Sequence, residues 1–260
     1  MIIFSRSFIL FKRFLFLFFI LISSLKIKAQ YSIRDSIITF PMIGATFAYQ
    51  FPGGDIVERF GNNYNVGSVF QWKLRRNWII GIEGNFLFGE EVKERNILDK
   101  YFTPDGNIIN GNGQYGTVSL SERGFKIEMK GGKIIPVIGP NKNSGLLTTI
   151  GLGYLQHKIL IETPDSPIPY LEGEYRKGYD RLTSGLSISE FIGYINFSNR
   201  KLINFYAGFE FTQAFTKNRR VLNFDTGLRD DKSRLDLFTG LRIGWVFPIY
   251  KRIADKSYIN

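Results

Sequence analysis

Beyond residue 41, apolar side chains alternate along the chain with polar or small ones at a period of two residues, and no segment keeps a helical apolar stripe. Such alternation predicts strands with two unlike faces. In the stretch 235–247, for example, Leu241 and Trp245 fall on one face, opposite Gly240 and Arg242. The pattern therefore predicts an all-β protein.

Eight segments are long enough to supply the about 9–11 residues that a tilted strand needs to cross a bilayer. They are 41–51, 62–74, 78–88, 123–137, 145–162, 182–197, 202–217 and 234–249. Short connections at 75–77, 138–144 and 198–201 alternate with long ones at 52–61, 89–122, 163–181 and 218–233. Because bacterial outer-membrane barrels join strands by short periplasmic turns and long external loops, we expect an eight-stranded antiparallel up-and-down transmembrane β-barrel over residues 41–250.

The second face of these strands distinguishes a membrane barrel from a soluble β-sandwich. It carries mostly Gly, Ala, Thr and Asn with single charges, opposite a face of large aromatic residues. Small residues suit the crowded inside of a narrow barrel, whereas aromatic residues suit contact with lipid. We favour the barrel and keep the sandwich as the alternative. Gly131-Gly132 interrupts the fourth strand and predicts a bulge or sharp coil there.

The first 29 residues have the three regions of a secretory signal. Lys12 and Arg13 precede the apolar run 14–22, and Ala29 offers a small residue for cleavage. The run is shorter than the about 20 apolar residues of a membrane helix, which is the alternative interpretation. We expect a signal peptide at 1–29, a periplasmic leader at 30–40 and a periplasmic tail at 251–260.

Charge and composition exclude several classes of function. Without the five basic residues of the signal, 29 basic and 23 acidic residues remain, a net charge of +6 that is spread along the chain. Nucleic-acid binding would require a basic patch. The absence of cysteine excludes a thiol nucleophile, a cysteine-ligated metal and disulfides. We predict no metal site and no cofactor.

The chain from Pro41 to Tyr250 resembles the small eight-stranded outer-membrane β-barrel proteins of the OmpA and OmpX type, especially those of Bacteroidota. The Ala29-Gln30 junction is similar to signal cleavage sites common in that phylum. The strand 235–249, with Trp245 and Phe247, resembles the terminal strand that the barrel assembly machinery reads. The resemblance implies a location in the bacterial outer membrane.

Asp35-Ser36-Ile37 is similar to the Asp-Ser/Thr-aliphatic pattern of O-glycosylation in Bacteroidota. This resemblance implies a sugar on Ser36. The alternative is a polar leader without a modification.

Charged residues interrupt the inner face of several predicted strands. By parity this set comprises Lys73, Glu83, Lys126, Glu128, Lys130, Glu190, Glu210, Asp236 and Arg242. Burying charges is costly unless they are paired, so we predict an internal ion-pair network that plugs the lumen. The alternative is a narrow passive channel lined by the same charges.

The loop 163–181 is the richest candidate for binding, because loops on a rigid scaffold often carry function. Its candidate surface comprises Tyr170, Glu172, Glu174, Tyr175, Arg176 and Tyr179. Tyrosine and arginine are enriched at protein interfaces. We predict a structural or protein-interaction role, as an accessory subunit of a larger envelope complex. The alternative for the loop 163–181 is a solvated hairpin that only extends the barrel. Outer-membrane lipids and lipopolysaccharide are further expected partners.

His157 is the only histidine. Some outer-membrane barrel enzymes pair one histidine with serine and an acid or amide near the external rim, so a lipid-modifying enzyme is a second alternative. No Gly-x-Ser-x-Gly elbow accompanies His157, and we predict that the protein is not an enzyme.

Overall fold

The computed structural model describes residues 36–164, 167–198 and 203–250. Residues 36–249 of this described part belong to one compact unit. The predicted signal peptide 1–29 and tail 251–260 lie outside the described residues, as does most of the leader 30–40. Within the described ranges, no helix has both the length and the apolar character to span a membrane.

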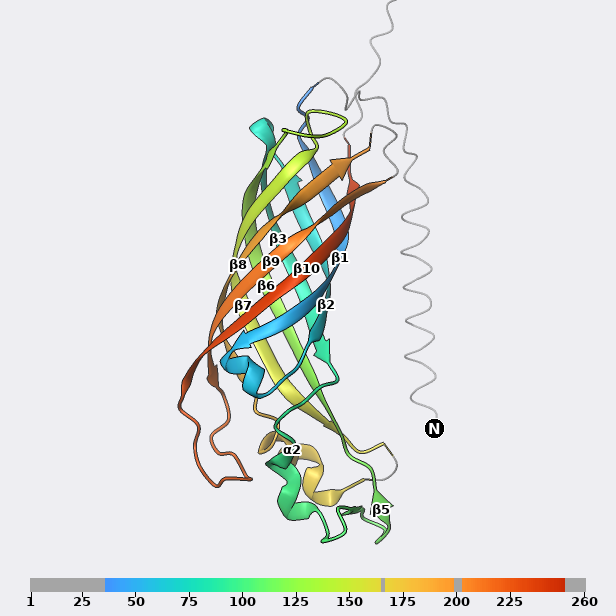
Figure 1. The fold of residues 1–260 in the computed structure, drawn as a ribbon, viewed down its shortest axis with the longest axis vertical. Helices are drawn as coiled ribbons and strands as arrows, with labels where there is room; N and C mark the ends of the chain where they lie inside the picture. The colour runs from blue at the N-terminus through green and yellow to red at the C-terminus, as the bar shows by residue number, and fades with distance from the viewer. Residues whose placement is uncertain (1–35, 165–166, 199–202, 251–260) are drawn as a thin grey trace, which may run out of the picture. The chain divides into compact units, whose positions relative to one another are not determined.

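Eight antiparallel strands form a closed barrel (Figure 1). They are β1 (Phe40–Gly54), β2 (Asn63–Lys73), β3 (Trp78–Gly89), β6 (Ser119–Ile135), β7 (Gly145–Glu162), β8 (Thr183–Phe197), β9 (Asn204–Asn218) and β10 (Ser233–Pro248). Each of these eight strands pairs with the one before it and the one after it in this order, and β1 closes the sheet by pairing with β10. The predicted up-and-down barrel is confirmed, and the β-sandwich alternative is wrong.

The register of β6 corrects one local prediction. Ile80 pairs with Gly131 and Ile79 with Gly132, and the same register continues without a break along β6 to both neighbouring strands. The expected bulge at the two glycines is therefore absent.

All long connections leave the same end of the barrel, where β5 and α2 lie in Figure 1. They contain η1 (Asp55–Glu58), η3 (Arg95–Tyr101), the two-stranded sheet of β4 (Ile108–Ile109) and β5 (Tyr115–Gly116), η4 (Pro169–Leu171) and α2 (Gly173–Lys177). The other end carries the short connections, including η2 (Arg75–Asn77). The alternation of short and long connections expected from the sequence is confirmed.

Candidate functional site

Inside the barrel, three carboxylates and three cations form a single cluster. Its members are Glu83 on β3, Lys126, Glu128 and Lys130 on β6, Glu210 on β9 and Arg242 on β10. Strand alternation turns all six side chains inward, and each is at most 4% exposed. The cluster is therefore almost completely removed from solvent.

The contacts cross the lumen from wall to wall. Arg242 donates from Nη2 to Glu210 Oε2 at 2.6 Å and from Nη1 to Glu83. Lys130 Nζ lies 2.9 Å from Glu83 Oε2 and 3.0 Å from Glu210 Oε1. Lys126 Nζ lies 3.1 Å from Glu128 Oε1. Because equal numbers of opposite charges meet, the cluster is neutral, which offsets much of the cost of burying it.

The three carboxylates also have the spacing of a possible cation site. Oxygens of Glu83, Glu128 and Glu210 lie within 4.8 Å of one another. Each of these carboxylates, however, already has a lysine or arginine within ion-pair distance. The ammonium and guanidinium groups thus supply the positive charge that a metal would otherwise provide.

Three other residues predicted for this network have different positions. Lys73 is buried but donates to Ile38 O and Asn143 Oδ1, both at 2.8 Å, where the leader meets the short connections. Asp236 accepts from His157 rather than from a cation of the cluster. Glu190 lies on the outer wall, where it is exposed, so its assignment to the lumen was wrong. The reason is parity: Phe191 faces inward on β8, and Glu190 therefore faces outward.

His157 lies inside the barrel toward the loop end and is only 1% exposed. Its Nε2 lies 3.0 Å from Asp236 Oδ2, and Thr216 Oγ1 donates to the same oxygen. The ring of Phe60 packs edge-on at 5.6 Å. The hydroxyl and the imidazole thus share one carboxylate oxygen, whereas a nucleophile relay needs the imidazole to contact the hydroxyl. This geometry favours a packed, structural histidine.

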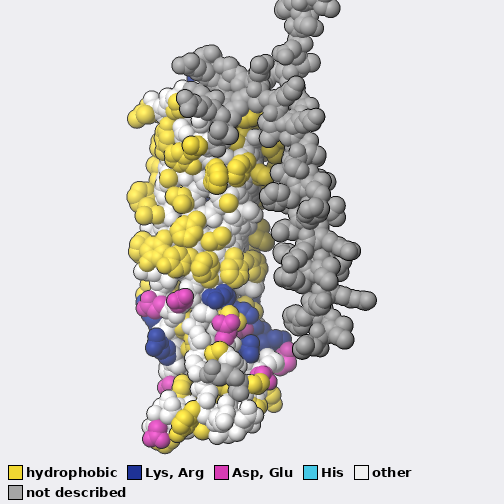
Figure 2. Space-filling view, turned by 90° about the vertical axis from the view of Figure 1, so that its right-hand side faces the viewer, with side chains coloured by type: hydrophobic (Ala, Val, Ile, Leu, Met, Phe, Trp, Pro, Cys, Tyr) yellow, Lys and Arg dark blue, Asp and Glu magenta, His cyan; other side chains and the backbone are white. Residues whose placement is uncertain are grey.

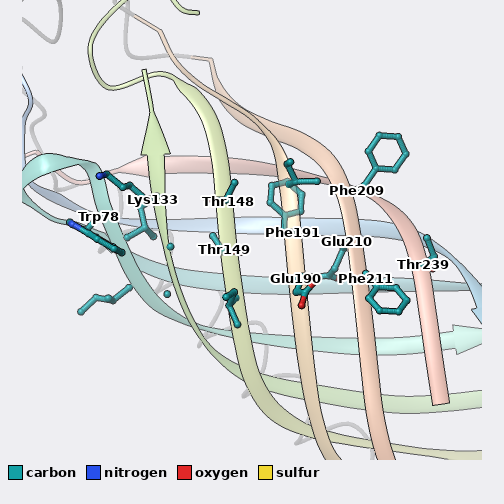
Figure 3. A pocket seen from close by; sticks show the side chains of 16 residues that line it. Trp78, Lys133, Thr148, Thr149, Glu190, Phe191, Phe209, Glu210, Phe211 and Thr239 are labelled. Carbon is teal, nitrogen blue, oxygen red and sulfur yellow. The ribbon is translucent and has the colours of Figure 1, made fainter. Parts of the chain in front are cut away.

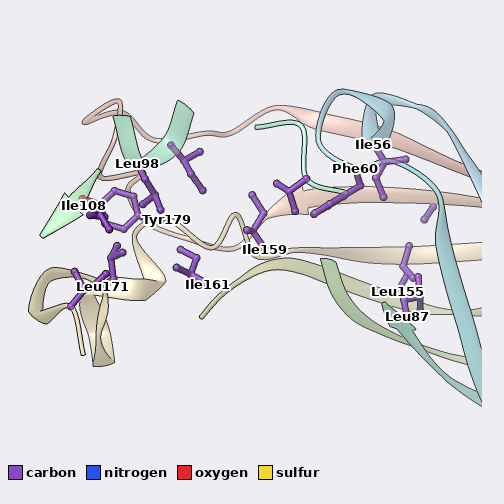
Figure 4. Packing of buried hydrophobic residues seen from close by; sticks show 14 of the residues in the cluster. Ile56, Phe60, Leu87, Leu98, Ile108, Leu155, Ile159, Ile161, Leu171 and Tyr179 are labelled. Atoms are coloured by element: carbon purple, nitrogen blue, oxygen red, sulfur yellow. The ribbon is translucent and has the colours of Figure 1, made fainter. Parts of the chain in front are cut away.

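A hydrophobic core continues from the lumen into the loops (Figure 4). Its members come from several barrel strands and from the connections, and include Phe60, Leu98, Ile159, Leu171 and Tyr179. Three of the long connections, 52–61, 89–122 and 163–181, contribute residues to this core, and the fourth, 218–233, packs against it through Phe224 on Tyr179. We call these four connections together the loop head. Because its apolar side chains are buried together with barrel residues, the loop head is anchored to the barrel end rather than freely solvated.

Arginine–aspartate pairs also fasten the loops to one another. Arg181 donates two hydrogen bonds to Asp225 at 2.8 and 2.5 Å, and Arg220 donates two to Asp180 at the same distances. Burial alone would raise the pKa of Asp225, but the bidentate hydrogen bonds from Arg181 outweigh it and the pKa lies below its usual value. Such two-point pairs are geometrically specific, so they fix the relative positions of these loops.

The candidate surface predicted on the loop 163–181 is divided by the structure. Glu172, Glu174 and Tyr175 are exposed, Tyr170 and Arg176 are half-buried, and Tyr179 is buried. Tyr179 was therefore wrongly assigned to the surface. Its hydroxyl lies 2.5 Å from that of Tyr101, and its ring packs on Phe224, which places it in the core of the loop head.

The outer wall is apolar where a water-soluble protein would be polar. Its exposed side chains include Ile43, Phe47, Val66, Phe70, Ile82, Phe86, Ile127, Met129, Ile150, Leu152, Ile192, Phe209, Leu241 and Ile243. Met129 alone is 72% exposed. On the face drawn in Figure 2, hydrophobic side chains form a yellow band over the strands, and charged side chains lie toward the loop end. A closed ring of hydrogen-bonded strands with such a band satisfies its backbone inside a hydrocarbon layer.

Aromatic side chains mark both edges of this band. Trp78 and Trp245 lie near the short turns, and Tyr64 lies near the loops. On the loop side, Leu186 of β8 pairs with Phe215 of β9, and Lys217 lies two residues further along β9 toward the loops. Aromatic girdles followed by charge are typical of the two membrane–water interfaces. The chain is an eight-stranded transmembrane β-barrel.

No family model matches the sequence of this barrel, and no curated protein matches it either. Several solved structures resemble it at low sequence identity. Neisserial surface protein A is 6% identical, with a TM-score of 0.42 over 80% of this chain and 99% of that one. Ail of Yersinia pestis is 11% identical, with a TM-score of 0.37 over 81% and 100%. OprG from Pseudomonas aeruginosa is 11% identical, with a TM-score of 0.38 over 84% and 99%.

Proposed function

We propose that this barrel is a non-conducting protein of the bacterial outer membrane that presents its loop head to a protein partner, as an accessory subunit of a larger envelope complex. The observation that carries the proposal is the loop head itself, a set of long connections packed around a common core. A fixed surface loses little conformational entropy on binding, which favours specific recognition. The signal-like segment 1–29 supports export to that membrane.

The ion cluster supports the non-conducting part of the proposal. An eight-stranded barrel is just wide enough to be filled by its own side chains. Arg242 reaches both Glu83 and Glu210 across that width, and apolar side chains such as Phe60 and Phe238 fill the section toward the loops. An ion entering the lumen would have to break these contacts.

The exposed side chains of the loop head favour a protein as the partner. Tyr175 in α2, and Val221 and Leu228 in the connection 219–232, are exposed although they are large and apolar or aromatic. Glu172 and Glu174 lie beside Tyr175 and are exposed as well. Aromatic anchors bordered by charge are typical of interfaces, where the aromatic side chain carries much of the binding energy.

In-cell photo-crosslinking tests this proposal directly. A photoreactive amino acid at Val221 is expected to yield one discrete adduct, which co-purifies in detergent and disappears in the Tyr175→Ala variant. Tyr115→Ala is the matched control, because Tyr115 is an exposed tyrosine of another loop. A barrel that gives no adduct, or an adduct equally weakened by both variants, would contradict the proposed role.

We propose lipids of the outer leaflet as the second class of partner. A groove of about 530 Å³ on the outer wall has Leu186 and Phe215 on its membrane side and Lys217 and Arg219 toward the loops. Arg219 is held in place by donating to Ser184 Oγ at 2.7 Å. An anionic glycolipid such as lipopolysaccharide would match this arrangement, with its acyl chains on the apolar membrane side of the groove and its phosphate groups at the two basic residues. Loss of co-purified anionic lipid in Lys217→Gln, but not in Lys133→Gln at the other rim, is the expected result.

A further inference from the structure

Glu190 is an ionisable residue on the lipid-facing wall of the barrel. On β8 it stands between Ile188 and Ile192, and it pairs across the sheet with Ile150 and Phe211. All four neighbours face outward and are apolar. Among the described residues, none forms a hydrogen bond or ion pair with the Glu190 carboxylate. The carboxylate is thus surrounded by hydrocarbon-facing side chains.

The position of Glu190 along β8 places it near the middle of the apolar band. Leu186 lies in the aromatic row at the loop side, and Tyr194 lies near the short-turn side. Glu190 is four residues from each of them. At about 3.3 Å per residue, along a strand tilted by about 40°, either rim is roughly 10 Å away. Ionisable groups at such depth are costly, and they generally pair with another group and mark a functional site.

A groove of about 780 Å³ on the outer wall lies beside Glu190 (Figure 3). It runs across several strands, from Trp78 and Lys133 at the short-turn rim to Phe209 and Phe211 on β9. Gly131 is one reason for the hollow, because a Cβ built there meets no heavy atom within 4 Å. The wall is therefore low at Gly131 on β6, whereas Phe209 on the β9 side of Glu190 projects outward and is 63% exposed.

We propose that two copies of this chain associate within the membrane through this wall, with Glu190 of each copy at the twofold axis. Both copies must keep their loops on the same side, so the axis is parallel to the membrane normal and residues meet partners at equal depth. On the axis Glu190 meets the partner's Glu190. Two carboxyl groups that share a proton hydrogen-bond to each other, since a protonated carboxyl donates and an ionised one accepts.

The shape of the wall is also self-complementary about this axis. The rotation brings the β9 side of one copy against the β6–β7 side of the other. Phe209 of each copy then faces the hollow at Gly131 of its partner, beside Ile150. Small residues that let walls approach closely, together with a polar contact, are the usual basis of association in lipid, where apolar burial alone gives little gain.

Mass measurement of the barrel in nanodiscs tests the proposal. We expect a dimer for the unmodified chain and for Glu190→Gln, because a carboxamide also both donates and accepts. Glu190→Leu should reduce the dimer fraction at least tenfold. Gly131→Leu should do the same by filling the hollow, whereas the control Gly84→Leu should not, although a Cβ at Gly84 is equally free of contacts. A monomeric unmodified chain, or equal effects of Gly131→Leu and Gly84→Leu, would overturn the proposal.

Disulfide crosslinking in native membranes provides the second measurement, and the chain offers a clean background because it has no cysteine. Ile192→Cys, beside the axis, should yield a covalent homodimer. Val66→Cys on β2, which lies on the opposite wall, should remain monomeric. Adducts of Ile192→Cys with another membrane protein instead of a second copy, or no adduct at all, would contradict the twofold contact.

Discussion

Arg242 and Glu210 lie on adjacent strands, and their side chains meet inside the lumen with Nη2 2.6 Å from Oε2. Arg242 pairs in the sheet with Gly208, not with Glu210, so the contact is diagonal. The same guanidinium reaches Glu83 on the other side of the barrel. One side chain therefore connects β10 to both β9 and β3, and its loss should affect the whole closed sheet.

Arg242→Met should destabilise the barrel by about 3–5 kcal/mol, because it removes one partner of a buried ion network and leaves two carboxylates with less compensation. Urea unfolding in lipid vesicles measures this change. Lys142→Met is the control, since Lys142 is exposed in a short connection, and its effect should stay within about 0.5 kcal/mol. Equal effects of the two variants would show that the cluster contributes no specific stability.

The loop head should loosen in acid. The pKa values of Asp225 and Asp230 lie below their ordinary value because, despite burial, hydrogen bonds from Arg181 and Arg234 favour the charged forms. The unfolded loop thus takes up protons at a higher pH than the folded one. The stabilisation is fully present above the ordinary value of 3.8 and is lost as pH falls through the lower folded values.

Near-ultraviolet circular dichroism of the stacked rings of Tyr101 and Tyr170, 4.2 Å apart, reports on this loosening. The signal should decline below about pH 3.8 while the barrel remains folded. Asp225→Asn should weaken the signal already at neutral pH. A signal that persists in acid until the barrel itself unfolds would contradict a role for these pairs.

His157→Gln should leave the lipid composition of the envelope unchanged, since His157 is buried and contacts Asp236 rather than a hydroxyl group. His157→Ala should in addition lower stability by about 1–3 kcal/mol, because Asp236 then loses a buried hydrogen bond. Lipid mass spectrometry and unfolding in vesicles measure the two effects. A change in lipid composition with His157→Gln would instead support the enzyme alternative.

Sequence alternation was sufficient to predict the eight barrel strands, because one face must contact lipid and the other a narrow lumen. The largest difference is at β6, which begins at Ser119 rather than at 123. The same alternation correctly predicted that Glu83, Glu128 and Arg242 face the lumen, since their strands alternate cleanly. It failed at Glu190, because the inner face of β8 also carries large apolar residues such as Phe191 and Ile195, so that both faces of this strand are apolar.

The loop head could not be predicted in the same way. Its fastening pairs, such as Arg181 with Asp225, join connections that lie far apart along the chain, and nothing local in the sequence marks them. Tyr179 and the exposed Tyr175 belong to the same loop, and the local sequence does not distinguish them. Tyr179 is buried because Tyr101 and Phe224, from other loops, pack against its ring. Such contacts follow from tertiary packing and not from periodicity.

Planar-bilayer recording of the purified, folded barrel tests whether the buried ion cluster closes the lumen. If the paired charges of Glu83, Lys130, Glu210 and Arg242 close the lumen, the protein should insert without reproducible conductance steps. Regular steps from the unmodified barrel would show that the lumen is open and would support a narrow channel.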